Sequence, residues 1–385
     1  MTPANLVTFY EKIFPAKDFF LWLNHSSVPS LDFKNREIAF LLPQDVYLRY
    51  QSFSTSDEFK RELKRLAPIR FEVGPIYNYD PRMRKTVAEG TFRPLSKELV
   101  FDIDLTDYND VRTCCNEDKV CPKCWQFVTV AILILDRILR EDFGFQHILW
   151  VFSGRRGVHA WVCDAEAREF DETERRAIVS YIDIFEGPNH KVALPPDEPH
   201  PHLEKAIEII TERFHEIMLV DQDLWRSPQA ASALLSRFSS SVAKAVKWEP
   251  DDSSVTKWTL LEEAVANLTD ADEKAAAEHQ LANIALQCLY PRLDAEVSKH
   301  LNHLLKSPFC VHPKTDKICV PIDLGNLESF DPDQVPQLEM VAGQYESVAS
   351  ASKTMLSPYL EVFNQFVTKM LTCEKRPQEN LDLEF

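Results

Sequence analysis

Hydrophobic and polar positions follow two periods along the chain, and these periods predict its helices and strands. Apolar residues at helical spacing predict helices over 6–23, 57–66, 125–141, 169–184 and 340–371. Alternation predicts strands over 36–50 (two strands around a turn at 43–45), 71–76, 98–107, 147–152, 158–163, 287–297 and 311–321. Between 203 and 289 every pattern is helical and glycine is absent. A helical block between two β-rich parts predicts an α+β fold, a mixed α/β architecture.

The same patterns divide the chain into a core of two parts and an inserted helical subdomain. We expect the first part of the core at 1–186, with a metal-binding element at 113–125, and the second part at 286–372. The helical subdomain is expected at 187–285, because a proline-rich stretch at 187–202 precedes it. A polar tail at 373–385 is expected to be disordered.

Composition narrows the classes of protein to consider. The chain has 385 residues, of which 45% are hydrophobic and 27% charged, as in an ordinary globular protein. Its longest apolar stretch, near 127–135, is too short to span a bilayer, and the N-terminus lacks the pattern of a signal peptide, so we expect no membrane association. The net charge of −17 argues against nucleic acid as a ligand, although net charge is a poor guide to a local groove. Nine cysteines without a secretory signal indicate a reducing compartment.

The segment ELVFDIDLTD at 98–107 places two carboxylates, Asp102 and Asp104, on one face of a predicted strand. Two strand steps separate them by roughly 6.6 Å, so both can reach a shared set of hard cations such as Mg²⁺ or Mn²⁺. Without a cation, two buried carboxylates would repel each other. A solvated acidic edge strand is the alternative that this segment leaves open.

Glycine is scarce, with 8 in the chain, and two of the eight flank Arg155 and Arg156 in the sequence SGRRG. The two predicted strands on either side make this a hairpin turn. Two guanidiniums beside exposed backbone N–H groups form a phosphate cradle, to which Ser153 adds a hydroxyl and His159, on the return strand, an imidazole. The alternative is a solvated basic turn.

A third group of polar residues lies in LYPRLDAEVSKHLNHLLKSPFCVHPKT. Alternation there predicts that Asp294 adds a third carboxylate from a different strand, and Lys306 and His312 follow as polyphosphate ligands. Three acids for two metal ions, with cations for a polyphosphate, are what nucleotidyl transfer requires. The chain has no GxxxxGK[ST] motif, which disfavours a P-loop NTPase. A two-metal nuclease remains an alternative, with less need of phosphate-binding cations.

Four cysteines, Cys114, Cys115, Cys121 and Cys124, follow the pattern CC-x5-C-x2-C. Four thiolates within eleven residues can surround one tetrahedral Zn²⁺, and a site with four protein ligands is structural. The C-x2-C half of the pattern directly precedes the helix predicted from 125, and the N-terminus of a helix stabilises the negative charge of a thiolate. The adjacent pair at 114 and 115 departs from the common spacing.

These segments together resemble the small catalytic subunits of eukaryotic-type DNA primases, in the archaeo-eukaryotic primase superfamily. The resemblance is carried by ELVFDIDLTDYNDVR, CC-x5-CPKCW, LWVFSGRRGVHAWVCD and YPRLDAEVSKHLNHLLKSPFCVHPKT, and it runs from the N-terminus to about 331. It is weakest at 203–280. It implies a primase fold with mixed β-sheets flanked by helices, a zinc-binding element and an inserted helical subdomain.

The resemblance also implies a function, the synthesis of short RNA primers on a single-stranded DNA template from ribonucleoside triphosphates, during replication in the nucleus. On the matching positions, Asp102, Asp104 and Asp294 would be the catalytic aspartates that bind Mg²⁺ or Mn²⁺. The nucleotide would be held by Arg49, Ser153, Arg155, Arg156, His159, Lys306 and His312. The cysteines at 114, 115, 121 and 124 would bind zinc.

Two positions depart from the family pattern. Glu72 stands where an aspartate near the nucleotide ribose is expected, and Asn109 replaces an acid. The resemblance implies partners, namely a large primase subunit with an iron–sulfur cluster and the DNA polymerase α complex. Two other functions stay open, a repair-type primase-polymerase that prefers deoxynucleotides and works alone, and an inactive scaffold in a replication complex.

Overall fold

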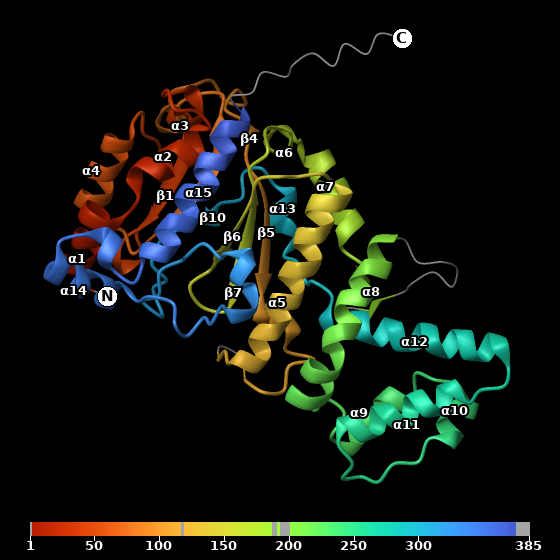
Figure 1. The fold of residues 1–385 in the computed structure, drawn as a ribbon. Coiled ribbons are helices and arrows are strands. Elements are labelled where there is room, and N and C mark those ends of the chain that lie inside the picture. The colour runs from red at the N-terminus through yellow and green to blue at the C-terminus, as the bar shows by residue number, and fades with distance from the viewer. Residues whose placement is uncertain (1, 117–118, 187–190, 193–200, 375–385) are drawn as a thin grey trace. The chain divides into compact units, whose positions relative to one another are not determined.

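The computed structural model describes residues 2–116, 119–186, 191–192 and 201–374 (Figure 1). The chain forms two compact units. Unit 1 comprises Met1–Asp102, Phe145–Val179 and Asp294–Phe385, and unit 2 comprises Ile103–Gly144 and Ser180–Leu293. These compact units do not show which parts of the chain fold independently, so the division predicted at 186/187, 285/286 and 372/373 stays a prediction.

Unit 1 contains an antiparallel sheet that presents one face to a core and one polar face. Its strands, in the order β10-β3-β1-β2 with β4 also paired to β3, are β1 (Arg36–Leu41), β2 (Tyr47–Gln51), β3 (Arg70–Tyr77), β4 (Pro94–Ser96) and β10 (Leu305–Lys306). Phe40 lies opposite Phe71, and both are fully buried in an aromatic core. The alternate positions point the other way, so Lys306 lies opposite Glu72 on the polar face.

Helices cover the buried face of this sheet. They are α1 (Pro3–Thr8), η1 (Phe9–Ile13), α2 (Ala16–Asn24), α3 (Leu31–Lys34) and α4 (Ser56–Leu66), and the ring of Phe59 from α4 stacks on Phe19 from α2 at 5.1 Å. The single helix predicted at 6–23 is interrupted at Pro15, because proline lacks the N–H that a continuous helix needs.

The helix predicted at 340–371 is also divided. It consists of α14 (Leu338–Val348), the short η8 (Ala351–Lys353) and α15 (Ser357–Glu374), because Ala349 takes a left-handed conformation that ends α14. Cys373 and Glu374 belong to α15, and the rest of the predicted tail, 375–385, lies outside the described residues.

A second sheet in unit 1 has the order β5-β7-β6, with β5 (Leu99–Asp104), β6 (Ile148–Phe152) and β7 (Gly157–Val162). The predicted hairpin is confirmed, since β6 and β7 pair antiparallel with Val151 opposite His159. The strand predicted at 311–321 forms only isolated bridges, because Pro313 and Pro321 interrupt the ladder. The remaining elements of this part of the chain are η2 (Pro43–Asp45), η3 (Pro81–Met83), α6 (Ala165–Glu169), α7 (Glu172–Ile182), α13 (Ala295–Lys299) and η7 (Leu324–Ser329).

Unit 2 is mostly helical, as the pattern at 203–289 predicts. Its elements are η4 (Leu105–Tyr108), α5 (Pro122–Arg137), η5 (Ile138–Asp142), the paired β8 (Phe185–Glu186) and β9 (Lys191–Val192), α8 (Pro201–Phe214), η6 (His215–Asp221), α9 (Pro228–Leu235), α10 (Ser240–Ala245), α11 (Ser254–Ala266) and α12 (Ala271–Leu289). Helix α8 packs against α5 and α12. Within the described residues of the whole chain, no helix combines the length and apolar character needed to cross a bilayer.

Candidate catalytic site and metal centre

Asp102 and Asp294, 192 positions apart in the sequence, meet in unit 1. The backbone N–H of Asp294 donates to the carbonyl of Asp102 at 3.1 Å. The prediction of a strand around Asp294 is wrong, because α12 continues to Leu289 and Asp294 is the N-cap of α13, where its Oδ1 accepts from the N–H of Glu296 at 3.2 Å. The predicted proximity of the acid to β5 is nevertheless what the fold produces.

Asp104 follows Asp102 by two residues on β5, and both are half-buried between fully buried neighbours. The chain passes into unit 2 after Asp102. Oδ1 of Asp104 accepts from the N–H and the hydroxyl of Thr106 at 2.9 and 2.8 Å, which caps η4. An ionised carboxylate has about four lone-pair sites, so a cap does not exhaust its capacity for a cation.

His159 on β7 lies beside Asp102, with 3.6 Å between Nε2 of the imidazole and Oδ1 of the carboxylate. The histidine is buried, and burial together with the charge of Lys306 lowers its pKa to about 3. The imidazole is therefore neutral near pH 7 and can hydrogen-bond without adding a charge.

The turn between β6 and β7 is hydrogen-bonded to β10 and to the segment that follows it. Nζ of Lys306 donates to the carbonyl of Ser153 at 3.0 Å, and the hydroxyl of Thr315 donates to the carbonyl of Gly154 at 2.6 Å. Gly154 has φ +89°, and a Cβ there would lie 2.6 Å from Cβ of His312, so both conformation and space require glycine. The hydroxyl of Ser153 accepts from the N–H of Gly157 at 3.2 Å and closes the turn.

The surroundings of His312 are strongly cationic. Burial, followed by the charges of Lys306, Arg155, Arg70 and Lys314, lowers the pKa of His312 to about 3. In a chain of net charge −17, this concentration of positive charge favours an anionic ligand. We call the residues brought together in unit 1 the carboxylate–cation cluster, and they are Asp102, Ser153, Gly154, His159, Asp294, Lys306 and His312.

Arg49 lies on the polar face of the first sheet of unit 1. Its Nε and Nη2 donate to the carboxylate of the fully buried Glu37 at 2.9 and 3.2 Å. Lys306 belongs to the same sheet face, opposite Glu72, which pairs with Arg70 at 2.8 Å and accepts from the hydroxyl of Tyr47. Arg49 therefore shares a sheet face with Lys306, and its guanidinium is paired with Glu37.

Sequence reasoning missed two charged residues of this face, Glu37 and Arg70, and the nearby His303. The sequence could have revealed Arg70, because it alternates with Phe71 and Val73. Period two therefore places Arg70 and Glu72 on the face away from the core. His303 precedes β10, and burial lowers its pKa while the nearby Asp294 and Glu72 oppose that shift.

Arg292, two residues before Asp294, has a structural role. It is buried in unit 2, pairs with Asp110 and donates to the carbonyl of Gln287 at 2.8 Å. Asn109, which departs from the family pattern, accepts from Nη2 of Arg112 at 2.6 Å.

The four cysteines predicted to bind zinc meet in unit 2, where all their sulfur atoms lie within 4.8 Å of one another. The Sγ atom of Cys121 is 3.6 Å from that of Cys114 and 3.8 Å from that of Cys124. A tetrahedron with Zn–S bonds of about 2.3 Å has edges of about 3.8 Å, so the geometry fits one zinc ion. Burial and the neighbouring thiols raise the pKa of Cys115 to about 11. A bound divalent cation would offset the repulsion between the thiolates.

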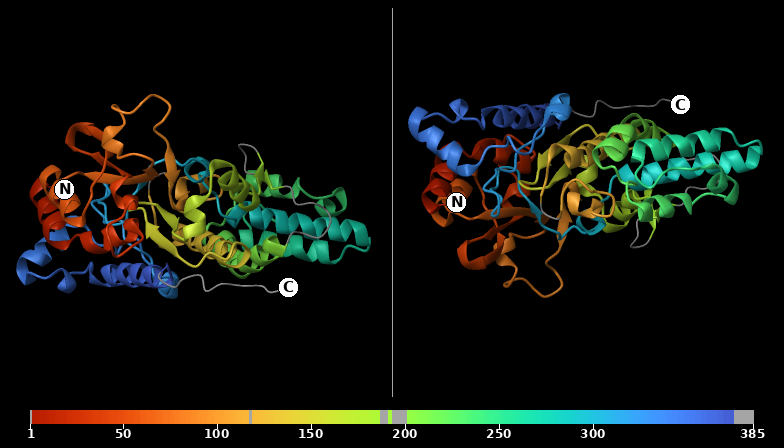
Figure 2. Two further views of the ribbon diagram at one scale, coloured as in Figure 1. Left: turned by 90° about the horizontal axis from the view of Figure 1, so that it is seen from above. Right: turned by 90° about the horizontal axis from the view of Figure 1, so that it is seen from below.

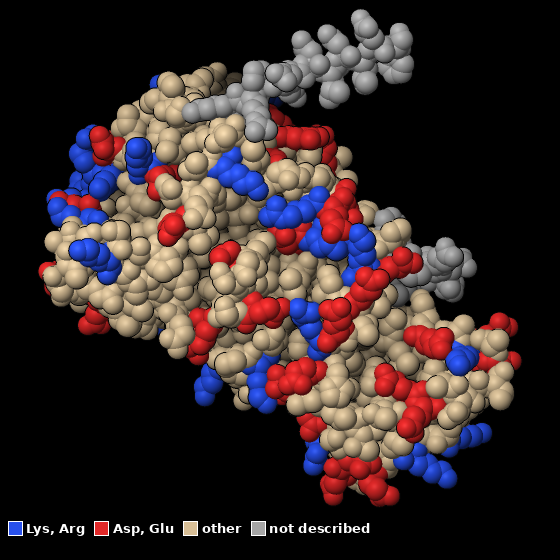
Figure 3. Space-filling model, in the orientation of Figure 1, with Lys and Arg blue, Asp and Glu red and all other residues tan. Residues whose placement is uncertain are grey.

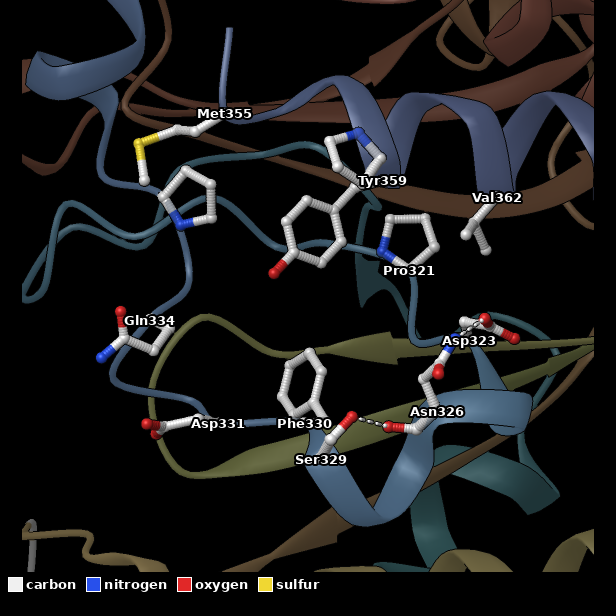
Figure 4. A pocket seen from close by; sticks show the side chains of 12 residues that line it. Pro321, Asp323, Asn326, Ser329, Phe330, Asp331, Gln334, Met355, Tyr359 and Val362 are labelled. Atoms are coloured by element: carbon white, nitrogen blue, oxygen red, sulfur yellow. Dashed lines mark hydrogen bonds between the residues drawn. The ribbon is translucent and has the colours of Figure 1, made fainter.

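A separate cavity of about 350 Å³ in unit 1 is lined by residues around η7 and the start of α15 (Figure 4). Phe330 and Tyr359 face each other across it, and Asp323 and Asp331 lie at its edge. None of the predicted site residues lines this cavity.

Comparison with known proteins identifies the family. The family model described as DNA primase small subunit matches residues 101–324, which include Asp102, Asp104, the turn at 153–157, Asp294 and His312 but not Arg49. The chain belongs to the DNA primase small subunit family. The primase small subunits of three organisms are similar to it over most of their length, with 49% identity in Schizosaccharomyces pombe (86% of this chain, 75% of that protein), 39% in Saccharomyces cerevisiae (98% and 95%) and 36% in Drosophila melanogaster (99% and 93%).

Membership of the primase small subunit family confirms the resemblance seen in the sequence, and the mixed α/β architecture is confirmed by the strands and helices of the two units. A DNA primase is a nucleotidyltransferase, which makes this an enzyme family.

Proposed function

We propose that this chain synthesises short RNA primers on single-stranded DNA, by nucleotidyl transfer from ribonucleoside triphosphates, at the initiation of DNA replication. The observation that supports this best is the carboxylate–cation cluster, in which Asp294 is hydrogen-bonded to Asp102 while Lys306 is hydrogen-bonded to the arginine turn. Acids and cations from distant segments thus converge, as a reaction between a hydroxyl and a metal-bound triphosphate requires.

The three aspartates have the chemistry of a site for hard cations. Asp102, Asp104 and Asp294 would hold Mg²⁺ or Mn²⁺, since carboxylate oxygen is the ligand that both ions prefer. When bound, two such ions lower the pKa of the attacking 3′-hydroxyl and neutralise charge on the leaving pyrophosphate. His159 beside Asp102 is neutral, so it adds no positive charge next to the cation that Asp102 would bind.

Lys306 of the cluster and the two arginines of the turn that contains Ser153 and Gly154 would bind the triphosphate. Arg155, Arg156 and Lys306 neutralise its charge, and guanidiniums can do so with two parallel hydrogen bonds. The turn of Ser153 and Gly154 adds backbone groups, and His312 adds an imidazole whose pKa would rise beside a phosphate. Arg49, held by Glu37, would act from the polar sheet face.

The cysteine cluster would hold one structural Zn²⁺, since its four sulfur ligands leave no open position. We further propose a large primase subunit as partner, because the relatives are named small subunits, and an assembly with the DNA polymerase α complex in the nucleus. The iron–sulfur cluster would belong to the large subunit, since within the described residues the four cysteines assigned to zinc are the one group of thiols gathered closely enough to hold a metal.

A primer-synthesis assay on single-stranded DNA, with and without a co-purified large subunit, tests this function. We expect labelled RNA products that depend on ribonucleotides, on template and on Mg²⁺ or Mn²⁺. Preference for deoxynucleotides without a partner would instead favour a repair-type primase-polymerase. Degradation of a labelled primer without nucleotide would favour a nuclease, and an Asp104→Ala variant with unchanged activity would favour a scaffold.

A further inference from the structure

The loop between β3 and β4 departs from the acidic character of the chain. Residues 82–93 include four cationic residues, at 82, 84, 85 and 93, and one acid, Glu89. Acidic side chains are spread over the face of the molecule drawn in Figure 3, whereas this loop projects from unit 1 in both views of Figure 2 (orange). The loop is therefore a local cationic surface that the proposed catalytic chemistry does not use.

Aromatic side chains support the cations of this loop. The guanidinium carbon of Arg84 lies 4.3 Å from the ring centroid of Tyr50, and that of Arg49 lies 4.9 Å from the same ring. Tyr77 and Phe92 stack at 4.2 Å, and Phe92 is 6.0 Å from Tyr50. We call Tyr50, Tyr77, Arg84 and Phe92 the aromatic–arginine platform.

Tyr50 is held in its position by the buried carboxylate of Glu37. Tyr50 has φ +59°, which is unfavourable for a bulky residue, at an irregularity in the pairing of β1 with β2. Its N–H donates to Oε1 of Glu37 at 3.1 Å, and the hydroxyl of Tyr77 donates to Oε2 at 3.1 Å. One carboxylate thus orients both tyrosines of the platform and Arg49, so the platform is preorganised.

The cationic charge beside the platform is available to a ligand. Arg84 and Lys85 are exposed, and in the part of the chain that the structure describes neither forms an ion pair. Arg82, in contrast, pairs with Asp80 at 2.8 Å and with Glu58 at 3.3 Å. Arg84 therefore presents a planar cation, with one contact to Tyr50, next to a second positive charge.

We propose that the aromatic–arginine platform binds the single-stranded template DNA. Bases of any identity stack on aromatic rings and on guanidinium planes, while nearby cations contact the phosphates. Two cationic side chains with a fixed aromatic support match this chemistry, and the charge of a polynucleotide is complementary to theirs.

We infer that the platform binds the template strand and not the primer, because the two strands differ in base pairing. This inference rests on the proposed function. In templated synthesis the bases of the primer are paired, whereas those of the template ahead of the incoming nucleotide are unpaired and free to stack. The sheet order places β2, which carries Tyr50, three strands from Lys306 on β10, or about 14 Å at the usual strand spacing. That distance corresponds to about four stacked nucleotides.

Binding of a fluorescent oligo(dT) to the full chain, measured by anisotropy without nucleotides or divalent metal, tests the proposal. We expect Arg84→Ala with Lys85→Ala to weaken binding about 10-fold and to reduce the slope of log K against log salt by about 1.4, because about 0.7 is lost per single-strand phosphate contact. Tyr50→Leu should weaken binding about 3-fold or more, and Tyr50→Phe should retain it, since the ring is what supports Arg84.

The matched control is Lys353→Ala with Lys369→Ala, which removes the same charge from exposed positions on η8 and α15 and should leave the salt slope unchanged. In primer synthesis, the loop variant should raise the KM for template and leave the KM for nucleotide unchanged. Equal affinity and salt slope in the loop and control variants would overturn the proposal, as would a loop variant that loses an acidic protein partner but keeps oligo(dT). Neither result would affect the proposed function, which fails instead if the unaltered chain makes no primer with its partner subunit.

Discussion

The cysteine cluster of unit 2 and the carboxylate–cation cluster of unit 1 draw on the chain in opposite ways. The cysteines lie within eleven consecutive residues that end in the first turn of α5, and their sulfur atoms lie within 4.8 Å of one another. The other cluster combines β5, the β6–β7 hairpin, the N-cap of α13, β10 and the loop after it, whose residues span positions 102 to 312.

One site is therefore determined by a short segment of the sequence, and the other by the tertiary structure. A ligand set in one short segment needs little of the fold, so its geometry depends on spacing and on the metal. A set drawn from five segments exists only when the whole unit is folded, because contacts between the segments hold its members together. Variants should therefore affect the two clusters in different ways, and the predictions below run from the largest expected effect to the smallest.

Asp294→Asn should lower primer synthesis about 1000-fold or more, while the fold remains intact. Asparagine is a good N-cap, so α13 keeps its cap, but the charge that would bind a metal is lost. Steady-state rates and thermal melting of the variant measure the two effects separately. Asp272→Ala, on the exposed first turn of α12, is the control and should retain full activity. An active Asp294→Asn enzyme would mean that this residue is only a cap.

Removal of the metal from the cysteine cluster should lower the stability of the fold, without a direct effect on the chemistry of the carboxylate–cation cluster. We expect about one equivalent of zinc in the purified chain, and Cys121→Ser should lose it and melt about 5–10 °C lower. Elemental analysis and calorimetry measure the two quantities. Cys373→Ser, on the exposed end of α15, should change neither. Metal-free protein with an unchanged melting temperature would refute the structural role.

Arg156→Ala should lower kcat/KM for nucleotide about 10-fold, because a hydrogen bond to a charged group contributes about 1.5–3 kcal/mol. Lysine at this position should restore only part of the loss, since it cannot bind phosphate with a planar fork. Arg176→Ala on α7, which removes a surface pair with Glu172, provides a control of equal charge. If the two alanine variants had the same kinetics, the phosphate cradle would lose its support.

The smallest effect concerns the protonation of His312. Its pKa of about 3 in the free chain reflects burial and surrounding cations, so its NMR resonance should not titrate between pH 8 and 5. Bound tripolyphosphate should raise that pKa, because an anion favours the charged imidazole. By linkage, tripolyphosphate should then bind more tightly as the pH falls. A His312 resonance that behaves identically with and without the anion would place the polyphosphate elsewhere.

Local patterns predicted individual elements well where a single segment decides them. The β6–β7 hairpin matches its alternation to within a residue, and α4 begins one residue before its predicted start and ends as predicted. The strand predicted at 287–297 is wrong, because a short alternating run cannot be distinguished from the end of an alanine-rich helix followed by a cap. Pro15 interrupted a helix that periodicity alone made continuous.

The sequence by itself determined which types of side chain are available to bind metal and phosphate, and how the cysteines are spaced. It also determined the glycines of the arginine turn and the membership of the primase small subunit family. Each of these is a property of a segment, set by side-chain chemistry or backbone sterics. Only the tertiary structure decided that Asp294 is hydrogen-bonded to Asp102 and Lys306 to Ser153. It also decided that Glu37 orients Arg49 and Tyr50. Those contacts join segments up to 192 residues apart, and packing of the whole unit, rather than any local preference, holds them together.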